Sequence, residues 1–322
     1  AGGSLKALFE VRDGDNLENF KGKVTKADSY SLTVENISID NIKSLNLPDK
    51  DGKITVNNIS YSYDSWEAQV DAQGNIKSVT FNLSKDKAIA DPEKTVAEGY
   101  LLNAGSAINA RGIPYYMTQL NEFVRNFSEM FNQIESKGQN LNGDTPPTFF
   151  EAITNTAKVY DFSESEAYSK LPDGQTATIN SSSNTYYRMT AANFSVNKDV
   201  MNDVSLFATS TDYVKTDSCD IVDELKKLQS EKTVYRGDKA ESFLETIISN
   251  VSVDTEKAET YNKLYSNLEQ TIANQRTSVS GVDEDEEALN LVKFQYSYNM
   301  ASKIISVMNQ MLDKLINDTG VA

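Results

Sequence analysis

Apolar and polar residues alternate in four stretches within the first hundred residues, a pattern typical of half-buried β-strands. The alternation predicts strands over residues 30–35, 53–56, 65–70 and 76–83, with a hairpin turn over 71–75. Turn-forming pairs such as Asp51-Gly52 and Gly74-Asn75 lie between the strands. We therefore expect a small β-rich domain over residues 14–110.

The period changes at residue 111. Over residues 111–137 apolar side chains recur at alternating steps of four and three residues, an average of 3.5 that is typical of an amphipathic helix. Pro114 lies in the predicted first turn and Gly138 lies just past the last turn, as is usual for a helix. The predicted seam consists of Ile113, Met117, Leu120, Val124, Phe127, Phe131 and Ile134.

Residues 140–237 mix strand-like and helix-like pieces with polar loops. The pattern predicts strands near 186–190 and 193–196 and a short helix over 221–228. We expect a second β-rich or mixed domain over residues 140–237.

Helical spacing returns over residues 238–278, where Ala258, Tyr261, Leu264, Leu268 and Ile272 mark one face. The segment 276–281 is expected to break this helix. Asp283 then provides an N-cap, and the acidic residues after it suit the positive end of a helix dipole. This acidic run lacks the alternating ligands and the central glycine of a calcium loop.

The last predicted helix, over about residues 285–317, carries two apolar stripes that together cover more than half of its circumference. The first stripe consists of Leu289, Val292, Tyr296, Met300, Ile304, Val307, Met311 and Leu315. The second consists of Phe294, Tyr298, Ala301, Ile305, Met308, Leu312 and Ile316. A helix on the surface of a monomer needs one stripe of about 100°. Either this helix is the core of its own chain, or other subunits bury it, and we select the first stripe as the candidate subunit interface.

Composition excludes several classes of function. The chain has 322 residues, a net charge of −16, no histidine and a single cysteine, Cys219. A Ser-His-Asp triad, a Cys-His dyad, a histidine-bound zinc site and an intramolecular disulfide are therefore excluded. The acidic balance disfavours nucleic-acid binding, and no apolar run is long enough to span a membrane. We predict no catalytic, cofactor-binding or metal-binding residues.

A different class of function stays open, a surface carbohydrate-binding or carbohydrate-active domain. Paired Asp and Glu side chains can perform acid/base chemistry on sugars, although no pair stands out among the 47 acidic residues. Trp66 and the tyrosines of residues 14–110 either bind glycans or pack between strands.

Three stretches carry a resemblance to a known family. They are residues 2–13 (GGSLKALFEVRD), residues 113–124 (IPYYMTQLNEFV) and residues 276–295, which contain SGVDEDEEALNL. These stretches resemble the flagellar axial proteins, and within them the hook-associated family. Members of the family pair an N-terminal with a C-terminal helix. Because no N-terminal partner helix precedes Gly2, we expect this sequence to be a fragment.

The resemblance implies an α+β fold, an elongated α-helical stalk over residues 1–13, 111–139 and 238–322 with both β-rich domains inserted in it. It implies a structural, non-enzymatic component of the extracellular bacterial flagellum that joins hook to filament by helical self-assembly after type III export. The implied partners are copies of itself, the hook protein, a second junction protein and an export chaperone on the C-terminal helix. Neither nucleic acid nor membrane is an expected partner. Flagellin and the second junction protein remain alternative assignments.

Overall fold

A computed structural model of the chain describes residues 3–49, 51–85, 88–89, 92, 96, 98–165, 167–214, 218–231, 233–235 and 238–318. The chain divides into two compact units, Ala1–Ser249 and Asn250–Ala322. The first unit combines helices with a closed β-barrel, and the second is helical, so the protein is α+β.

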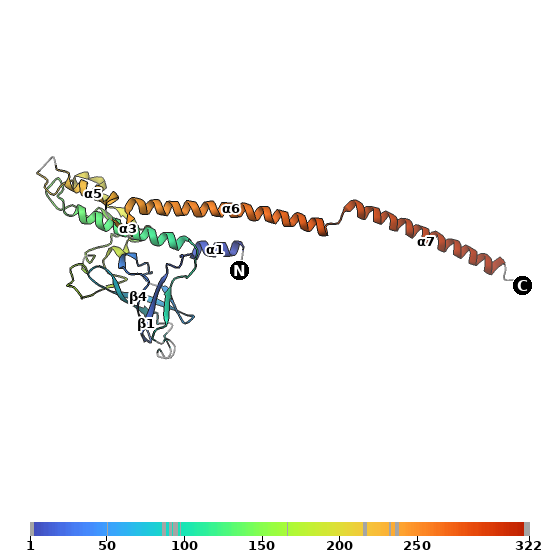
Figure 1. Ribbon diagram of the computed structural model, residues 1–322, viewed down its shortest axis with the longest axis horizontal. Helices are drawn as coiled ribbons and strands as arrows, with labels where there is room; N and C mark the ends of the chain where they lie inside the picture. The colour runs from blue at the N-terminus through green and yellow to red at the C-terminus, as the bar shows by residue number, and fades with distance from the viewer. Residues whose placement is uncertain are drawn as a thin grey trace. The chain divides into compact units, whose positions relative to one another are not determined.

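Six antiparallel strands close the barrel of the first unit (Figure 1). They follow one another around the wall in the order β3-β6-β1-β2-β5-β4, and pairing between β3 and β4 closes the ring. The strands are β1 (Phe20–Asp28), β2 (Ser31–Glu35), β3 (Gly52–Val56), β4 (Ile59–Val70), β5 (Ile76–Leu83) and β6 (Leu101–Ala104). Closure leaves the six strands with few free edges, which limits pairing between molecules.

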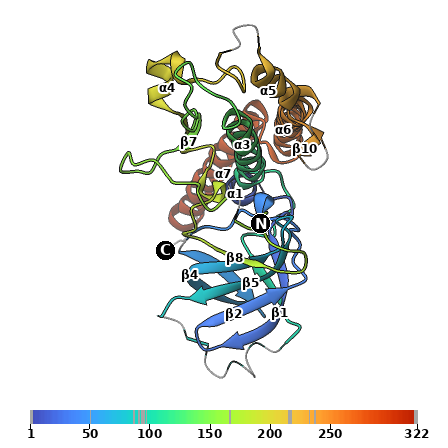
Figure 2. The ribbon, with the colours of Figure 1, turned by 90° about the vertical axis from the view of Figure 1, so that its left-hand side faces the viewer.

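Strand β4 is long enough to pair twice along one side. Its first half, from Ile59 to Tyr63, pairs with β3. Its second half, from Glu67 to Val70, pairs with β8 (Ala177–Asn180), which comes from much later in the sequence. Figure 2 shows β1, β2, β5, β4 and β8 side by side in the sheet.

The barrel interior is filled by alternate side chains of the strands. Its largest fully buried members are Trp66, Tyr63, Phe81, Leu32, Ile54 and Leu102. The strands and the hairpin turn predicted over 30–83 are confirmed, whereas β1 and β6 were not predicted. Trp66 is fully buried and packs edge-on against Tyr187, with ring centroids 4.8 Å apart. The suggestion that Trp66 binds glycans is therefore wrong, because no face of the indole is open.

The barrel leaves and rejoins the helices at two glycines that touch. Gly14 ends α1 (Ser4–Asp13) and Gly112 precedes α3 (Ile113–Glu135). The Gly112 amide donates to the Gly14 carbonyl at 3.0 Å. A Cβ on Gly112 would lie 2.7 Å from the Val11 carbonyl oxygen and 2.8 Å from the Gly14 nitrogen. Because φ is negative at both positions, crowding alone demands glycine here.

Helix α3 confirms the helix predicted over 111–137, and its apolar seam faces other helices. Phe243 and Ile247 of α6 (Ala240–Ser280) pack against Leu120 and Phe127. Further along, α5 (Asp220–Ser230) packs on Ile134 and Phe131. The short helix predicted over 221–228 is thereby confirmed.

Residues 140–237 are mostly irregular chain joined by short elements. These short elements are β7 (Phe150–Ala152), η2 (Tyr186–Arg188), β9 (Phe194–Val196), α4 (Lys198–Asn202), η3 (Val204–Leu206) and β10 (Thr233–Tyr235). Two more short elements lie outside this segment, η1 (Ile42–Ser44) and β11 (Asp238–Lys239). The strand predicted over 193–196 is confirmed as β9. The strand predicted over 186–190 is wrong, since η2 is a 3-10 turn there. The Thr185 hydroxyl accepts the Tyr187 amide hydrogen and nucleates that turn.

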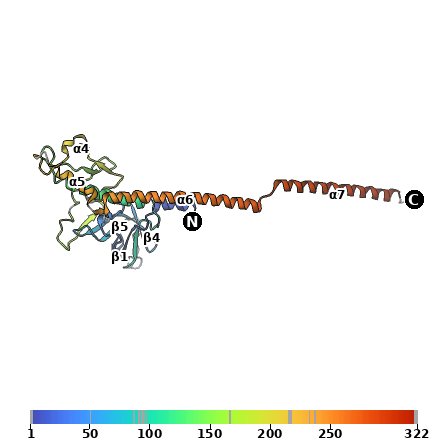
Figure 3. The same cartoon turned by 45° about the horizontal axis from the view of Figure 1, so that its top comes forward.

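The second unit contains the rest of α6 and α7 (Glu284–Asp318). Helix α6 runs to Ser280, so the break predicted over 276–281 begins only at Gly281. Figure 3 shows the short non-helical link between the two helices. Asp283 caps α7 as predicted, because its Oδ1 accepts the amide hydrogen of Asp285 at 3.0 Å.

Candidate assembly interface

Helix α7 carries all eight predicted interface residues, and every one is exposed. Their exposed fractions run from 48% at Val292 and Val307 to 69% at Tyr296. Within the described residues of the second unit, the first stripe of α7 is therefore open. Exposed apolar surface costs about 25 cal/mol per Å², so burying this stripe against another surface is strongly favourable.

The second stripe of α7 is equally exposed, from 51% at Leu312 to 74% at Phe294. At about 100° per residue, it lies roughly 130° around the helix from the first stripe. The remaining arc consists of uncharged polar side chains with Asp313 near its end: Gln295, Asn299, Ser302, Ser306 and Asp313. Two separate apolar stripes give α7 two different contact faces.

The spacing of the first stripe indicates how its neighbours run. Seven steps from Leu289 to Leu315 cover 26 residues, or 3.7 residues per step. A repeat slightly above the helix period of about 3.6 gives almost straight helices with a small right-handed drift. The α3 seam, at 3.5, has the left-handed drift of a coiled coil. Helix α7 is thus suited to packing between nearly straight neighbours.

Two further segments expose apolar side chains. On α1 these are Leu5, Leu8 and Val11, which are 56–66% exposed. On α6 beyond residue 250 they are Tyr261, Leu264, Leu268 and Ile272, which are 49–56% exposed. The apolar face predicted on α6 is therefore present, and its large side chains are exposed.

Helix α3 meets the barrel through a buried polar face, which the sequence analysis missed. Arg125 is only 4% exposed. Its Nε donates to the Met189 carbonyl at 2.9 Å and its Nη1 to the Leu45 carbonyl at 2.7 Å. The guanidinium also lies 4.4 Å from the centre of the Tyr187 ring. One buried cation thus ties α3 to the barrel and to residues 186–189.

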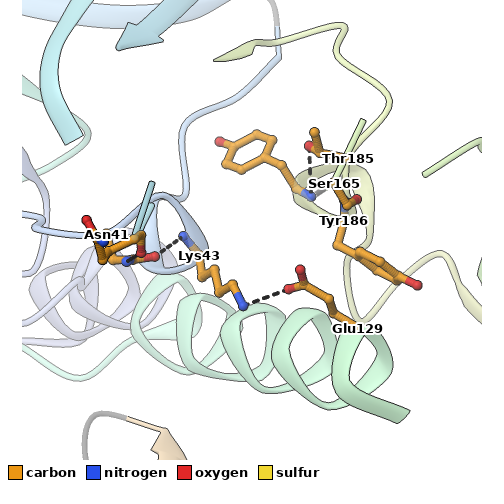
Figure 4. Close-up of polar contacts among 8 residues, drawn as sticks. Asn41, Lys43, Glu129, Ser165, Thr185 and Tyr186 are labelled. Atoms are coloured by element: carbon orange, nitrogen blue, oxygen red, sulfur yellow. Dashed lines mark hydrogen bonds and ion pairs between the residues drawn. The ribbon is translucent and has the colours of Figure 1, made fainter. Parts of the chain in front are cut away.

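Other polar residues of α3 extend this joint along the helix. Lys43 of η1 forms an ion pair of 2.8 Å with Glu129 (Figure 4). Elsewhere on the same face, the Ser44 hydroxyl donates to Glu122 at 3.1 Å. Directional bonds of this kind fix the barrel at one orientation on the helix. In the sequence these residues look like the solvent-exposed face of an amphipathic helix. No sequence pattern distinguishes a buried polar face from an exposed one.

Glu135 lies at the end of this face, where α3 meets residues 208–210. It is 2% exposed, and its Oε1 accepts the Ala208 amide hydrogen at 2.7 Å. Its Oε2 is buried with no hydrogen-bond partner among the described residues. Burial raises the pKa of Glu135 to about 7, because the charged form loses its hydration.

We expect Glu135→Gln to stabilise the protein above pH 7 and to change little near pH 4.5. With a folded pKa above the unfolded value, Glu135 binds its proton more tightly when folded. Its contribution to stability is therefore complete below the unfolded pKa and declines until the pH passes about 7. Glutamine cannot ionise, so the gain at pH 8 should be about 2 to 3 kcal/mol in urea unfolding. Glu256→Gln on α6, where the side chain is exposed, is the matched control for the loss of one carboxylate. A loss of stability at pH 8 would contradict the prediction.

Among the described residues, no cluster of three or more Cys, Asp and Glu side chains is arranged to hold a metal ion. Within the same part of the chain, no helix combines the length and the apolar content that crossing a membrane requires.

Two comparisons bear on the family. Residues 273–318, which include all of α7, match the family model for the C-terminal region of the flagellar basal body rod FlgEFG proteins. Flagellar hook-associated protein 1 of Bacillus subtilis (strain 168) is 24% identical over 215 residues, which are 65% of this chain and 36% of that protein. The chain thus spans about a third of the length of the curated relative it matches. The family-model match contains the motif at residues 276–295, and the chain is similar to flagellar rod proteins and to a flagellar hook-associated protein.

Proposed function

We propose that this chain belongs to a structural component of the bacterial flagellum that joins hook to filament and performs no catalysis. The observation that carries the proposal is the exposed, two-striped surface of α7, which lies inside the matched residues 273–318. A helix with two different apolar faces is buried when different neighbours pack on each side. Contacts between non-identical faces extend into rings or helical assemblies.

The proposed architecture is a discontinuous helical stalk, formed by residues 1–13, 111–139 and 238–322, that carries the two inserted regions outward. The proposed partners are copies of this chain, the hook protein, a second junction protein and an export chaperone that covers α7 before assembly. The proposed location is the hook–filament junction outside the cell, reached by type III export. The Bacillus subtilis relative favours hook-associated protein 1 over the alternatives, flagellin and the second junction protein.

We expect Met300→Asp, Ile304→Asp and Val307→Asp together to abolish incorporation at the hook end in the source cell. Three carboxylates in the middle of the first stripe cannot be buried against a neighbour without losing their hydration. Incorporation is measured by immunogold electron microscopy of flagella with antibody to this chain. The barrel should stay folded, which the fluorescence of buried Trp66 reports.

The matched control places the same charge on the polar arc of α7, as Asn299→Asp, Ser302→Asp and Ser306→Asp. This variant should incorporate much better than the first. Gold at the boundary of hook and filament supports a junction protein, and gold along the filament would indicate flagellin. Normal incorporation of the first variant, or no flagellar label on unmodified cells, would refute the proposal.

A further inference from the structure

A cavity of about 630 Å³ lies beside the second half of α3, within the first unit. Its lining comes from α3, from β7, from loop residues 159–163 and from Tyr186 of η2. Figure 2 shows β7 next to α3. Cavities that hold small-molecule ligands typically measure about 300–1,000 Å³. This cavity is therefore large enough for a small organic ligand.

Glu151 of β7 lines the cavity with a carboxylate that has no protein partner. The residue is only 7% exposed. No residue in the described part of the chain donates a hydrogen bond to this carboxylate or forms an ion pair with it. Burial, and then the negative charge of Asp199, raise the pKa of the Glu151 carboxyl. A buried acceptor without a donor costs free energy, which a ligand that supplies donors recovers.

Three more polar side chains around the cavity lack a partner. Gln133 of α3, Thr148 and Tyr160 all belong to the lining. Within the described residues, none of these three side chains forms a hydrogen bond to the protein. An amide offers both donors and an acceptor, and each hydroxyl can donate or accept. Together with Glu151, they present donors and acceptors from α3, β7 and two loops to one space.

One wall of the cavity is aromatic. The rings of Phe162 and Tyr186 are stacked, with centroids 4.3 Å apart and planes 15° apart. Both residues line the cavity and are half-buried. The Tyr160 ring lies 4.3 Å from the guanidinium of Arg188, which covers one of its faces. Aromatic rings beside polar groups suit a ligand that has an apolar face and polar edges.

Hydrogen bonds hold these walls in place before any ligand binds. The Asn132 Nδ2 donates to the Phe150 carbonyl and to the Tyr186 hydroxyl, each at 2.8 Å. The Asn132 Oδ1 accepts the Phe150 amide hydrogen at 2.9 Å. The Ser165 hydroxyl accepts the Tyr186 amide hydrogen at 3.1 Å. Because β7 and the aromatic wall are fixed to α3, binding has few side chains left to order.

The charges around the cavity favour an uncharged ligand. Glu151 and Lys170 contribute one charge of each sign to the lining. The carboxylate of Asp161 accepts hydrogen bonds from the Ser163 amide at 3.0 Å and from the Ser163 hydroxyl at 2.8 Å. A pyranose ring is uncharged, packs its C–H face on aromatic rings, and carries hydroxyl groups that donate to carboxylates and accept from amides. We propose that this cavity binds a pyranose unit of a carbohydrate.

The inference adds a binding function to the first unit and does not rest on the assembly role. All residues of the cavity lie before residue 198, whereas the apolar stripes of α7 belong to the second unit. Loss of sugar binding therefore leaves the surface of α7 unchanged, and the two proposals can fail separately.

The test is saturation-transfer difference NMR of the full chain with the methyl pyranosides of glucose, galactose, mannose and N-acetylglucosamine. Transfer to the ring protons of at least one sugar, with a Kd of about 1–10 mM, is the expected result, since one ring forms few contacts. No transfer to any of the sugars at about 20 mM would overturn the proposal. n-Butylammonium, which mimics a lysine side chain, serves as the charged probe. Transfer to this cation and to none of the sugars would also overturn the proposal and would indicate a cation site.

Variants locate the binding in this cavity. Glu151→Gln keeps the size of the side chain but removes the charged acceptor, so the Kd should rise about tenfold. Glu67→Gln is the matched control, because it removes an exposed carboxylate of β4 outside the cavity and should leave the Kd unchanged.

Gln133→Ala is the second cavity variant, and it decides the test if Glu151→Gln does not fold. Alanine suits a helix and removes the amide, so the Kd should rise about threefold. The fluorescence of buried Trp66 reports whether each variant is folded. A folded Glu151→Gln variant with an unchanged Kd, or in its place an unchanged Kd for Gln133→Ala, would put the sugar outside this cavity and overturn the proposal.

Discussion

Arg125→Leu is expected to lower the free energy of unfolding of the first unit by about 4 kcal/mol. Leucine fills much of the space but donates no hydrogen bond, so the Leu45 and Met189 carbonyls lose the charged donors at 2.7 and 2.9 Å. The cation over the Tyr187 ring is lost as well. Trp66 is the single tryptophan and packs against Tyr187, so its fluorescence during urea unfolding is a local measure of this joint.

Arg125→Lys is the matched control for charge. Lysine keeps the positive charge but cannot reach both carbonyls with the planar geometry of arginine, so we expect a loss of about 2 kcal/mol. Equal losses for the two variants would mean that the fork of the guanidinium, rather than its charge, holds the joint. A loss below about 1 kcal/mol for Arg125→Leu would show that the carbonyls find water and that the joint is not dry.

Gly112→Ala is expected to destabilise the barrel–helix neck by about 3 kcal/mol. The new methyl group would lie 2.7 Å from the Val11 oxygen and 2.8 Å from the Gly14 nitrogen. Each of these atoms belongs to the backbone, so no side chain can rotate away. Relief requires moving α1 away from α3, which breaks the 3.0 Å hydrogen bond from Gly112 to Gly14.

Gly174→Ala separates crowding from backbone preference. Gly174 has a φ of +83°, and a methyl group added there would meet no neighbouring atom within 4 Å. Its substitution therefore costs only about 1 kcal/mol, for the left-handed conformation. At Gly112 the situation is reversed, because its φ of −102° suits any residue but the surrounding backbone leaves no space for a methyl group. The free energy of unfolding of both variants is measured in urea. A smaller loss for Gly112→Ala than for Gly174→Ala would contradict the prediction that backbone crowding at Gly112 excludes a side chain.

The strongly periodic elements could be predicted from the sequence. Alternation located four strands of the barrel, and the spacing of apolar residues located α3, α5, α6 and α7. Strand β1 was missed because Gly22 takes one of its inward positions and a bulge between Val24 and Lys26 shifts the alternation. Strand β6 has only four residues, too few for a period. The pairing of β3 with β4 that closes the barrel depends on contacts between distant residues, which no local pattern contains.

The apolar stripe of α7 was predictable because its side chains, among them Met300, Ile304 and Val307, recur at helical spacing. The polar joint of α3 leaves no such trace, since Arg125 and Glu129 look alike whether they face water or buried carbonyls. Tyr186 and Tyr187 favour strands intrinsically, but capping by Thr185 and packing against Trp66 impose a 3-10 turn.

The neck at Gly14 and Gly112 has an evolutionary consequence. Because the barrel begins and ends at touching residues, a shorter, longer or absent insert can replace it while α1 and α3 keep their mutual placement. The face of α3 beneath the barrel carries Gln119, Asn121 and Glu122, which water can solvate once the barrel is gone. The two helices therefore place little constraint on the length or the fold of the insert.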